Sequence, residues 1–371
     1  MAKTLQERLE AVRERTVALA AEDAFSGVLH VQRGEETLLS AAHGTASRRW
    51  DVPVRASTRF DIASVTKVLT SIAVLQLVDA GTLRLDDRIH DRVDLTDSAI
   101  HPDVTLRHLL SHTSGIGDDA DEEAGESYEA LWEERPNYSV TETRDFLPQF
   151  VHKPANFAPG QGCRYCNVGY VLLGLAVEDA TGVPYRDVIR RDVMEKTGMR
   201  DSGFFDMRHA VPDVAEGWEP VRSSADGTLK GWRQNIYSYP PIGSPDGGAH
   251  ATAADLARML DSVLQGRILS EESTAMFRSP QALHHRVDAP KPGATAELHY
   301  AFGLEIELDA DGRVRSLYKD GINTGASAIV RHYPVGGHEQ GITLAVVTNS
   351  EDAAWEPVRL LDEAIIGFGS D

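Results

Sequence analysis

A serine and a lysine three positions apart, Ser64 and Lys67, form the strongest chemical signal in the sequence. Residues at i and i+3 share one face of a helix, so the two side chains meet if a helix begins at Ser64. A serine hydroxyl is a weak nucleophile at neutral pH, and a lysine can act as its base when burial or nearby positive charge lowers the lysine pKa. The helix N-terminus would favour an oxyanion beside Ser64. Because a serine N-cap followed by an exposed lysine is also common, this pattern alone does not establish a catalytic site.

A tyrosine and an asparagine, Tyr165 and Asn167, lie between a Pro159-Gly160 turn and an apolar segment typical of a helix. A phenol can relay a proton, and a side-chain amide can bind a substrate carbonyl and Lys67 together. We therefore expect both side chains to point into a cleft.

A third group, Lys319-Asp320-Gly321, ends a segment with the pattern of a β-strand near the C-terminus. Glycine carries no side chain, so Gly321 would allow a substrate to lie against the edge of this strand. Only tertiary structure can bring this group close to Ser64, which lies far away in the sequence.

The elements that must position these groups follow from the spacing of apolar residues. The pattern predicts an amphipathic helix over residues 4–22, two strands over 25–44 and a buried helix over 64–81. Four further strands are expected from about residue 299, and a final helix over 353–366. Between these regions, helical segments alternate with long connections rich in Gly, Pro and Asp.

Strands near both termini and a helical middle predict an α+β fold. We expect residues 1–63 and 295–371 to form one antiparallel sheet domain flanked by the terminal helices. Residues 64–294 would form a mostly helical domain inserted into it, and a small-molecule site is expected in the cleft between the two parts.

The composition excludes several classes of partner. The chain has 371 residues and 37 Lys and Arg against 57 Asp and Glu, a formal net charge of −20. Binding to nucleic acid or to an anionic membrane requires clustered basic residues, so we expect neither partner. The N-terminus is charged and lacks the apolar region of a signal peptide, and two cysteines cannot form a disulfide framework. We therefore expect a cytoplasmic protein.

Taken in order, the groups Ser-x-x-Lys, Tyr-x-Asn and Lys-x-Gly resemble the motifs of the serine β-lactamase and penicillin-binding-protein family. Residues 106–115 are similar to the family's Leu-Leu-x-His-Thr-Ser-Gly segment, and residues 247–257 to its Gly-Gly-x-x-x-Thr-x-x-Asp-Leu stretch. The resemblance extends from about residue 25 to 350. It is greatest to class C β-lactamases and their D,D-peptidase, D-amino-acid amidase and carboxylesterase relatives, and implies a class C β-lactamase-like fold.

The resemblance also implies a role for each matching residue. Ser64 would be the acylated nucleophile, Lys67 its proton partner and Tyr165 the general base that activates the deacylating acceptor. Asn167 would be the amide that orients the substrate.

The C-terminal group matches the family's substrate-binding edge. The oxyanion hole would use the backbone N–H groups of Ser64 and Ile322, and Lys319 would supply positive potential that tunes Tyr165 and attracts anionic substrate groups. The resemblance implies no metal and no organic cofactor.

One departure from the family pattern affects the expected substrate. Asp320 occupies the position where β-lactamases and D,D-peptidases usually have Thr or Ser, and an aspartate would repel a substrate carboxylate. We therefore expect a serine hydrolase that forms an acyl-enzyme with a small ester or amide. The alternatives are a transacylase of secondary metabolism that uses the same site, a true β-lactamase or D,D-peptidase, and a non-catalytic sensor that stays acylated.

Several other features have simpler interpretations. Cys163 and Cys166 are expected to be reduced thiols near the site, and His108 and His112 to be structural, because no further ligand completes a metal set. The acidic run 118–123 is expected to be an exposed loop. The tryptophans of the middle region are interpreted either as an acyl-binding wall or as packing residues: Trp132, Trp218 and Trp232.

Overall fold

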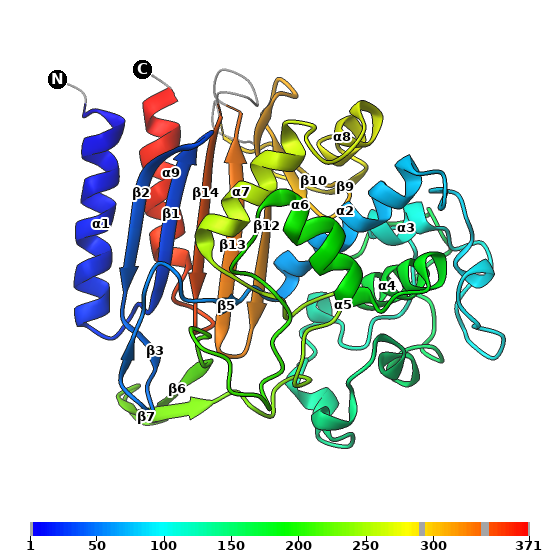
Figure 1. The fold of residues 1–371 in the computed structure, drawn as a ribbon, viewed down its shortest axis with the longest axis horizontal. Coiled ribbons are helices and arrows are strands. Elements are labelled where there is room, and N and C mark those ends of the chain that lie inside the picture. Colours follow the sequence, from blue (N-terminus) through cyan, green and yellow to red (C-terminus); the bar gives the residue numbers. More distant parts are fainter. Residues whose placement is uncertain (1–2, 289–293, 335–340, 370–371) are drawn as a thin grey trace.

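A sheet of eight strands forms the centre of the protein (Figure 1). The structure is a computed structural model that describes residues 3–288, 294–334 and 341–369. The strand order is β2-β1-β14-β13-β12-β11-β10-β9, and every neighbouring pair is antiparallel. The expected α+β fold is therefore confirmed. The strands of the sheet are β1 (Gly27–Arg33), β2 (Glu36–His43), β9 (Ala282–Arg286), β10 (Glu297–Tyr300), β11 (Glu305–Leu308), β12 (Val314–Asn323), β13 (Ala326–Tyr333) and β14 (Ile342–Thr348).

Helices cover both faces of the sheet. The terminal helices α1 (Leu5–Ala21) and α9 (Trp355–Gly369) lie side by side on one face, and α7 (Ala253–Leu264) packs on the other (Figure 1). Alternate residues of β14 point to opposite faces, so Val346 packs with α1 and α9 while Val347 packs in the cluster that contains α7. With both faces covered, every residue of β14 is buried.

The other helices lie beside the sheet and surround α2 (Thr66–Asp79) and α4 (Val168–Thr181), which pack against each other. Ten consecutive residues of each helix are buried, which explains their nearly continuous apolar sequences. The remaining α-helices are α3 (Leu106–Leu110), α5 (Tyr185–Val188), α6 (Glu195–Thr197) and α8 (Glu271–Phe277). Short 3-10 or π segments are η1 (Ala63–Val65), η2 (Ile89–Asp91), η3 (Glu122–Ala124), η4 (Glu129–Trp132), η5 (Asn137–Ser139), η6 (Thr143–Gln149) and η7 (Ile189–Met194).

Three small antiparallel pairs complete the fold. They are β3 (Thr45–Ser47) with β4 (Val52–Pro53), β5 (Phe60–Asp61) with β8 (His250–Ala251), and β6 (Trp218–Arg222) with β7 (Leu229–Gln234). The β5–β8 pair joins the segment just before Ser64 to the segment just before α7. It therefore links the segment that contains Ser64 to an element that packs on the sheet.

The C-terminal part of the sheet begins earlier than residue 295, the limit expected from the sequence. Strand β9 already pairs with β10 at the edge of the sheet, and α7 packs on the sheet although both elements belong to the segment assigned to the helical domain. The strands on either side of the expected boundary pair with each other, so the boundary falls within a hairpin of the sheet. In the described part of the chain, no helix combines the length and apolar character needed to cross a membrane.

Candidate active site

Ser64 lies in a tight turn between β5 and α2. The 3-10 segment η1 holds Ser64 at its centre and runs directly into α2, as the i, i+3 pattern predicted. The preceding residue, Ala63, has a φ of 44°, which a residue with a side chain adopts only at an energetic cost. Its N–H donates to Asp61 Oδ1 at 2.7 Å, and the N–H of Ile62 donates to the Ala249 carbonyl at 2.9 Å. These bonds hold the turn in its strained shape.

Lys67 is fully buried, and its Nζ lies among three neutral oxygen atoms. Nζ is 3.0 Å from Ser64 Oγ, 2.7 Å from Asn167 Oδ1 and 2.7 Å from the Asp246 carbonyl oxygen. A neutral amine in this position can donate its two N–H groups to the amide and carbonyl oxygens. Its lone pair then points to the Ser64 hydroxyl, which is the geometry that a general base requires.

Asn167 is positioned by a buried carboxylate that the sequence analysis placed in an exposed loop. Asp118 accepts the N–H of Asn167 at 2.8 Å and that of Val168 at 3.0 Å, and so satisfies backbone donors at the start of α4. Asp118 and Asp119 are both buried. Only the later part of the acidic run matches the expectation, since Asp121 is partly exposed and pairs with Arg164 at 2.6 Å.

Tyr165 lies between the two lysines of the site. Its ring centroid is 5.0 Å from Lys67 Nζ and 5.2 Å from Lys319 Nζ. The ring stacks on His112 at 4.7 Å, and His112 Nδ1 accepts the N–H of Cys166 at 3.1 Å. Burial, with the charges of both lysines, holds the pKa of His112 well below its usual value. His112 is therefore a neutral packing partner of Tyr165, and no cluster of metal-ligating side chains occurs in the described ranges.

Gly321 allows strand β12 to pass directly against the Ser64 turn. A Cβ atom at this position would lie 2.5 Å from the Ile62 carbonyl oxygen and 2.6 Å from the Ser64 nitrogen, both of which are backbone atoms. Any side chain would therefore push the strand away from the nucleophile. The sequence analysis assigned Gly321 to the approach of a substrate, whereas its contacts show that it brings the protein's own backbone close. Ile322, next along β12, is about half exposed (49 %).

Lys319 is buried and is bound by two carboxylates, which differs from its expected role. Its Nζ donates to Glu305 Oε1 and to Asp320 Oδ1, both at 2.8 Å. Burial alone would lower the pKa of Lys319, but the charges of Asp320 and Glu305 outweigh it and raise this pKa well above its usual value. The three groups together carry a formal charge of −1. These three residues, which we call the Lys319 corner, would therefore present a negative rather than a positive charge to an anionic substrate group.

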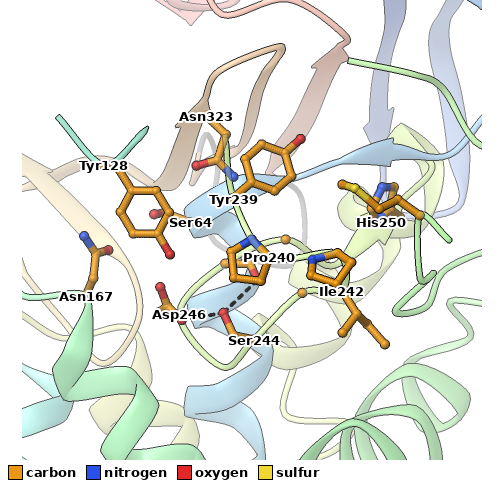
Figure 2. A pocket seen from close by; sticks show the side chains of 15 residues that line it. Ser64, Tyr128, Asn167, Tyr239, Pro240, Ile242, Ser244, Asp246, His250 and Asn323 are labelled. Atoms are coloured by element: carbon orange, nitrogen blue, oxygen red, sulfur yellow. Dashed lines mark hydrogen bonds between the residues drawn. The ribbon is translucent and has the colours of Figure 1, made fainter. Parts of the chain in front are cut away.

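A pocket of about 40 Å³ opens at Ser64. Figure 2 shows Tyr128 and Asn167 on one side of Ser64, with Tyr239 and His250 on the other. The structure thus unites Ser64, Lys67 and Asn167 by hydrogen bonds and places Tyr165, Lys319 and Gly321 around them. Sequence analysis missed several residues that support or line the site: Asp118, Tyr128, Tyr239, Asp246, Glu305 and Asn323. Of these residues, only Asp246 could have been found from the sequence, because it directly precedes the Gly-Gly stretch that resembles a family motif.

The cysteines and tryptophans lie outside this chemistry. Cys163 and Cys166 are free, and burial raises the pKa of Cys163 to about 12, so it remains a thiol. Trp132 and Trp218 are buried, and Trp232 packs under the Arg48 guanidinium at 3.4 Å. Their packing supports the second interpretation of the tryptophans, as structural residues.

A serine–lysine pair beside an inner strand of an antiparallel sheet, together with the surrounding helices, defines a serine hydrolase of the β-lactamase fold. The chain belongs to the Beta-lactamase family, whose family model matches residues 3–364. It is 35 % identical to Esterase EstB of Burkholderia gladioli over 286 residues, 71 % of each chain. It is 25 % identical to Penicillin-binding protein 4* of Bacillus subtilis (strain 168) over 354 residues, 93 % of this chain and 73 % of that one.

A solved structure agrees with this assignment. The penicillin-binding protein from Bacillus halodurans is 33 % identical to this chain and superposes with a TM-score of 0.82. The match covers 93 % of this chain and 99 % of that one. The resemblance stated from the motifs is therefore confirmed at the level of the family and the fold.

Proposed function

We propose that this serine hydrolase cleaves small esters or amides through an acyl-enzyme on Ser64. The observation that carries the proposal is the position of Lys67, whose Nζ is 3.0 Å from Ser64 Oγ while two neutral carbonyl oxygens accept its N–H groups. With two N–H groups bonded to the carbonyl oxygens, the lone pair of a neutral amine is directed at the Ser64 hydroxyl. The lysine can therefore take the proton of the serine hydroxyl.

The reaction proceeds in two acyl-transfer steps. Ser64 Oγ forms a bond to the substrate carbonyl carbon as its proton moves to Lys67, and the backbone N–H groups of Ser64 and Ile322 stabilise the oxyanion. Collapse of this intermediate breaks the bond to the leaving alcohol or amine, which takes the proton through Lys67 and Tyr165. Water, activated by Tyr165, then attacks the acyl group and releases the carboxylic acid, which restores the Ser64 hydroxyl.

The substrate proposed for this site lacks a carboxylate near the scissile bond. The support is the negative corner formed by Lys319, Glu305 and Asp320, which would repel an anionic group beside β12. The similarity to Esterase EstB favours an ester over a cell-wall peptide or a β-lactam.

The test is hydrolysis of p-nitrophenyl acetate and phenylalanine amide by the wild type and Ser64→Ala, with nitrocefin as the β-lactam probe. We expect ester turnover by the wild type, weak or no nitrocefin hydrolysis, and loss of turnover in Ser64→Ala. Thr70→Ser, a hydroxyl variant on the same buried helix, is the control for folding. Full activity of Ser64→Ala would contradict the mechanism, and efficient nitrocefin hydrolysis would contradict the substrate class. Product formed only when an alcohol or amine acceptor is added would identify an acyltransferase instead.

A further inference from the structure

A second, much larger cavity adjoins the pocket at Ser64. It encloses about 580 Å³ and lies between the segment around β3 and β4, residues 205–217, and the end of β7. Met207, Tyr239 and His250 line both this cavity and the Ser64 pocket. Figure 2 shows Tyr239 and His250 on the side of Ser64 away from Asn167. These three side chains therefore form the boundary between the nucleophile and the larger space.

The two volumes differ enough to decide where most of a substrate can be held. The pocket at Ser64, at about 40 Å³, accommodates only the few atoms around a reacting carbonyl. The adjoining cavity, at about 580 Å³, lies in the range of roughly 300–1,000 Å³ that is usual for small-molecule sites. A substrate larger than an acetyl ester thus has space for its remaining atoms in this cavity.

The walls of the cavity favour an apolar group. Four exposed large apolar side chains are gathered along it, and such a patch often marks a binding site: Trp50 (72 %), Val52 (43 %), Met207 (42 %) and Ile236 (38 %). Two of its acidic side chains are engaged by the protein, since Glu216 accepts from Ser47 Oγ at 2.7 Å and Asp206 from Arg208 Nε at 2.9 Å. The surface left to a ligand is therefore largely hydrocarbon.

The position of Tyr165 determines which part of the substrate faces this cavity. A leaving group must approach Lys67 and Tyr165 to receive its proton, and Tyr165 lies between Lys67 and Lys319. The residues that line the cavity include none of these three groups. They include Tyr239, which lies on the side of Ser64 away from Asn167, the residue that is hydrogen-bonded to Lys67 (Figure 2). The acyl part of the substrate therefore points toward the cavity, and the leaving group points away from it.

We propose that this cavity is the binding site for a long or bulky apolar acyl group, which passes Tyr239 and extends toward Trp50. The inference rests on the proposed acyl-enzyme mechanism and names its substrate class: carboxylic esters or amides with an apolar acyl chain of about six to ten carbons. Burial of each methylene strengthens binding of the acyl group by up to about fourfold, so specificity rises with chain length until the cavity is filled.

The experiment compares kcat/KM for p-nitrophenyl acetate, p-nitrophenyl octanoate and octyl acetate in three variants. Ala215→Phe places a ring inside the cavity, and Trp50→Ala removes an exposed side chain from its wall. The control, Val221→Phe, introduces the same ring at an exposed position of β6 outside the cavity. We expect the wild type and Val221→Phe to prefer the octanoate over the acetate by at least tenfold. In Ala215→Phe we expect the ratio of kcat/KM for the octanoate to kcat/KM for the acetate to fall at least tenfold. In Trp50→Ala we expect this ratio to fall about threefold, because the KM for the octanoate rises.

Octyl acetate distinguishes the acyl side from the alcohol side, because its chain leaves with the alcohol. We expect kcat/KM for octyl acetate, relative to that for p-nitrophenyl acetate, to change by no more than twofold in either cavity variant. A wild type without preference for the octanoate, or a preference that survives in both cavity variants, overturns the inference while ester hydrolysis itself continues. Loss of octyl acetate turnover in place of octanoate turnover overturns the assignment to the acyl side. Failure of the proposed function is distinct, because Ser64→Ala would then remain active on all three esters.

Discussion

The two buried lysines on either side of Tyr165 have opposite surroundings. Lys67 Nζ is bound by a hydroxyl, a side-chain amide and a backbone carbonyl, all of them neutral. Lys319 Nζ is bound by the carboxylates of Glu305 and Asp320. Both amines lie about equally far from the Tyr165 ring centroid, at 5.0 and 5.2 Å. Similar position and burial therefore do not mean similar chemistry.

The partner groups decide which lysine can exchange a proton. With its N–H groups donated to the amide and carbonyl oxygens, a neutral Lys67 directs its lone pair at Ser64, so this residue suits the proton transfer that Ser64 needs. The two carboxylates raise the pKa of Lys319 well above its usual value and keep it charged. Lys319 is therefore a fixed charge beside the Tyr165 ring, whereas the proposed mechanism assigns the proton transfer to Lys67.

The largest effect is expected when the Lys67 amine, which accepts the proton of Ser64 in the proposed mechanism, is removed. In Lys67→Met, kcat/KM for p-nitrophenyl acetate should fall about 10³-fold or more, because Ser64 loses the group that accepts its proton. Steady-state kinetics provide the measurement, and circular dichroism checks that the variant is folded. Lys230→Met, at an exposed position of β7, is the matched control and should retain wild-type kinetics. Wild-type kcat/KM in Lys67→Met would contradict the proposal that Lys67, unlike Lys319, accepts the proton of Ser64.

Removal of the fixed charge should have a smaller effect on rate and a clear effect on stability. In Lys319→Met the carboxylates of Glu305 and Asp320 lose their shared cation. We expect the free energy of unfolding to fall by about 3 kcal/mol, since breaking a buried ion pair leaves uncompensated charge. The kcat/KM should fall about 10²-fold. Urea denaturation measures the first effect, and Lys319→Met combined with Glu305→Gln and Asp320→Asn should recover most of the stability but not the rate.

The charge of the Lys319 corner is expected to select substrates by about tenfold. Burial would raise the pKa of Asp320, but the charge of Lys319 and its hydrogen bond outweigh burial and lower it, so Asp320 is ionised at neutral pH. Asp320→Asn should raise kcat/KM for 4-acetoxybenzoate, which carries its carboxylate on the leaving group, relative to phenyl acetate, about tenfold. Asp311→Asn, in an exposed turn, is the control. An unchanged ratio would mean that the corner does not contact the leaving group.

The smallest predicted effect concerns His112, whose pKa is lowered by burial and by both lysines. The folded protein disfavours protonation of this ring, whereas the unfolded chain titrates near pH 6.5. Stability from the neutral ring is therefore present above about pH 6.5 and is lost as the pH falls toward the folded pKa, at up to about 1.4 kcal/mol per pH unit. Urea denaturation at pH 7.5 and 5.5 should show a smaller difference in His112→Gln than in the wild type. An equal difference would mean that His112 is not the group that titrates.

The sequence predicted those parts of the site that depend on local spacing. Ser64 and Lys67 lie on the same helix, so their contact follows from the i, i+3 geometry alone. The apolar patterns also located the terminal helices and the strands β12 to β14 within a few residues. These features depend on the periodicity of a single segment, which a sequence displays directly.

The features that the sequence could not predict depend on register and on burial. Glu305 meets Lys319 only because β11 pairs with β12 in a register that places Glu305 opposite Tyr318. Asp118 belongs to an acidic run that is typical of exposed loops, and only its contact with the start of α4 shows that it is buried. The cavity near Trp50 is formed by segments more than 100 residues apart in the sequence. No local pattern marks any of these contacts.

The central claim is that Ser64 carries the acyl group and that Lys67 enables its transfer. The most direct measurement is the intact mass of the protein, quenched within milliseconds to seconds of mixing with p-nitrophenyl octanoate, followed by peptide mapping. We expect the wild type to gain one octanoyl group on the peptide that contains Ser64, Lys67→Met to gain it at least 10²-fold more slowly, and Ser64→Ala to gain none. Rapid acylation of Lys67→Met, or turnover by the wild type with an adduct on another residue, would contradict the account.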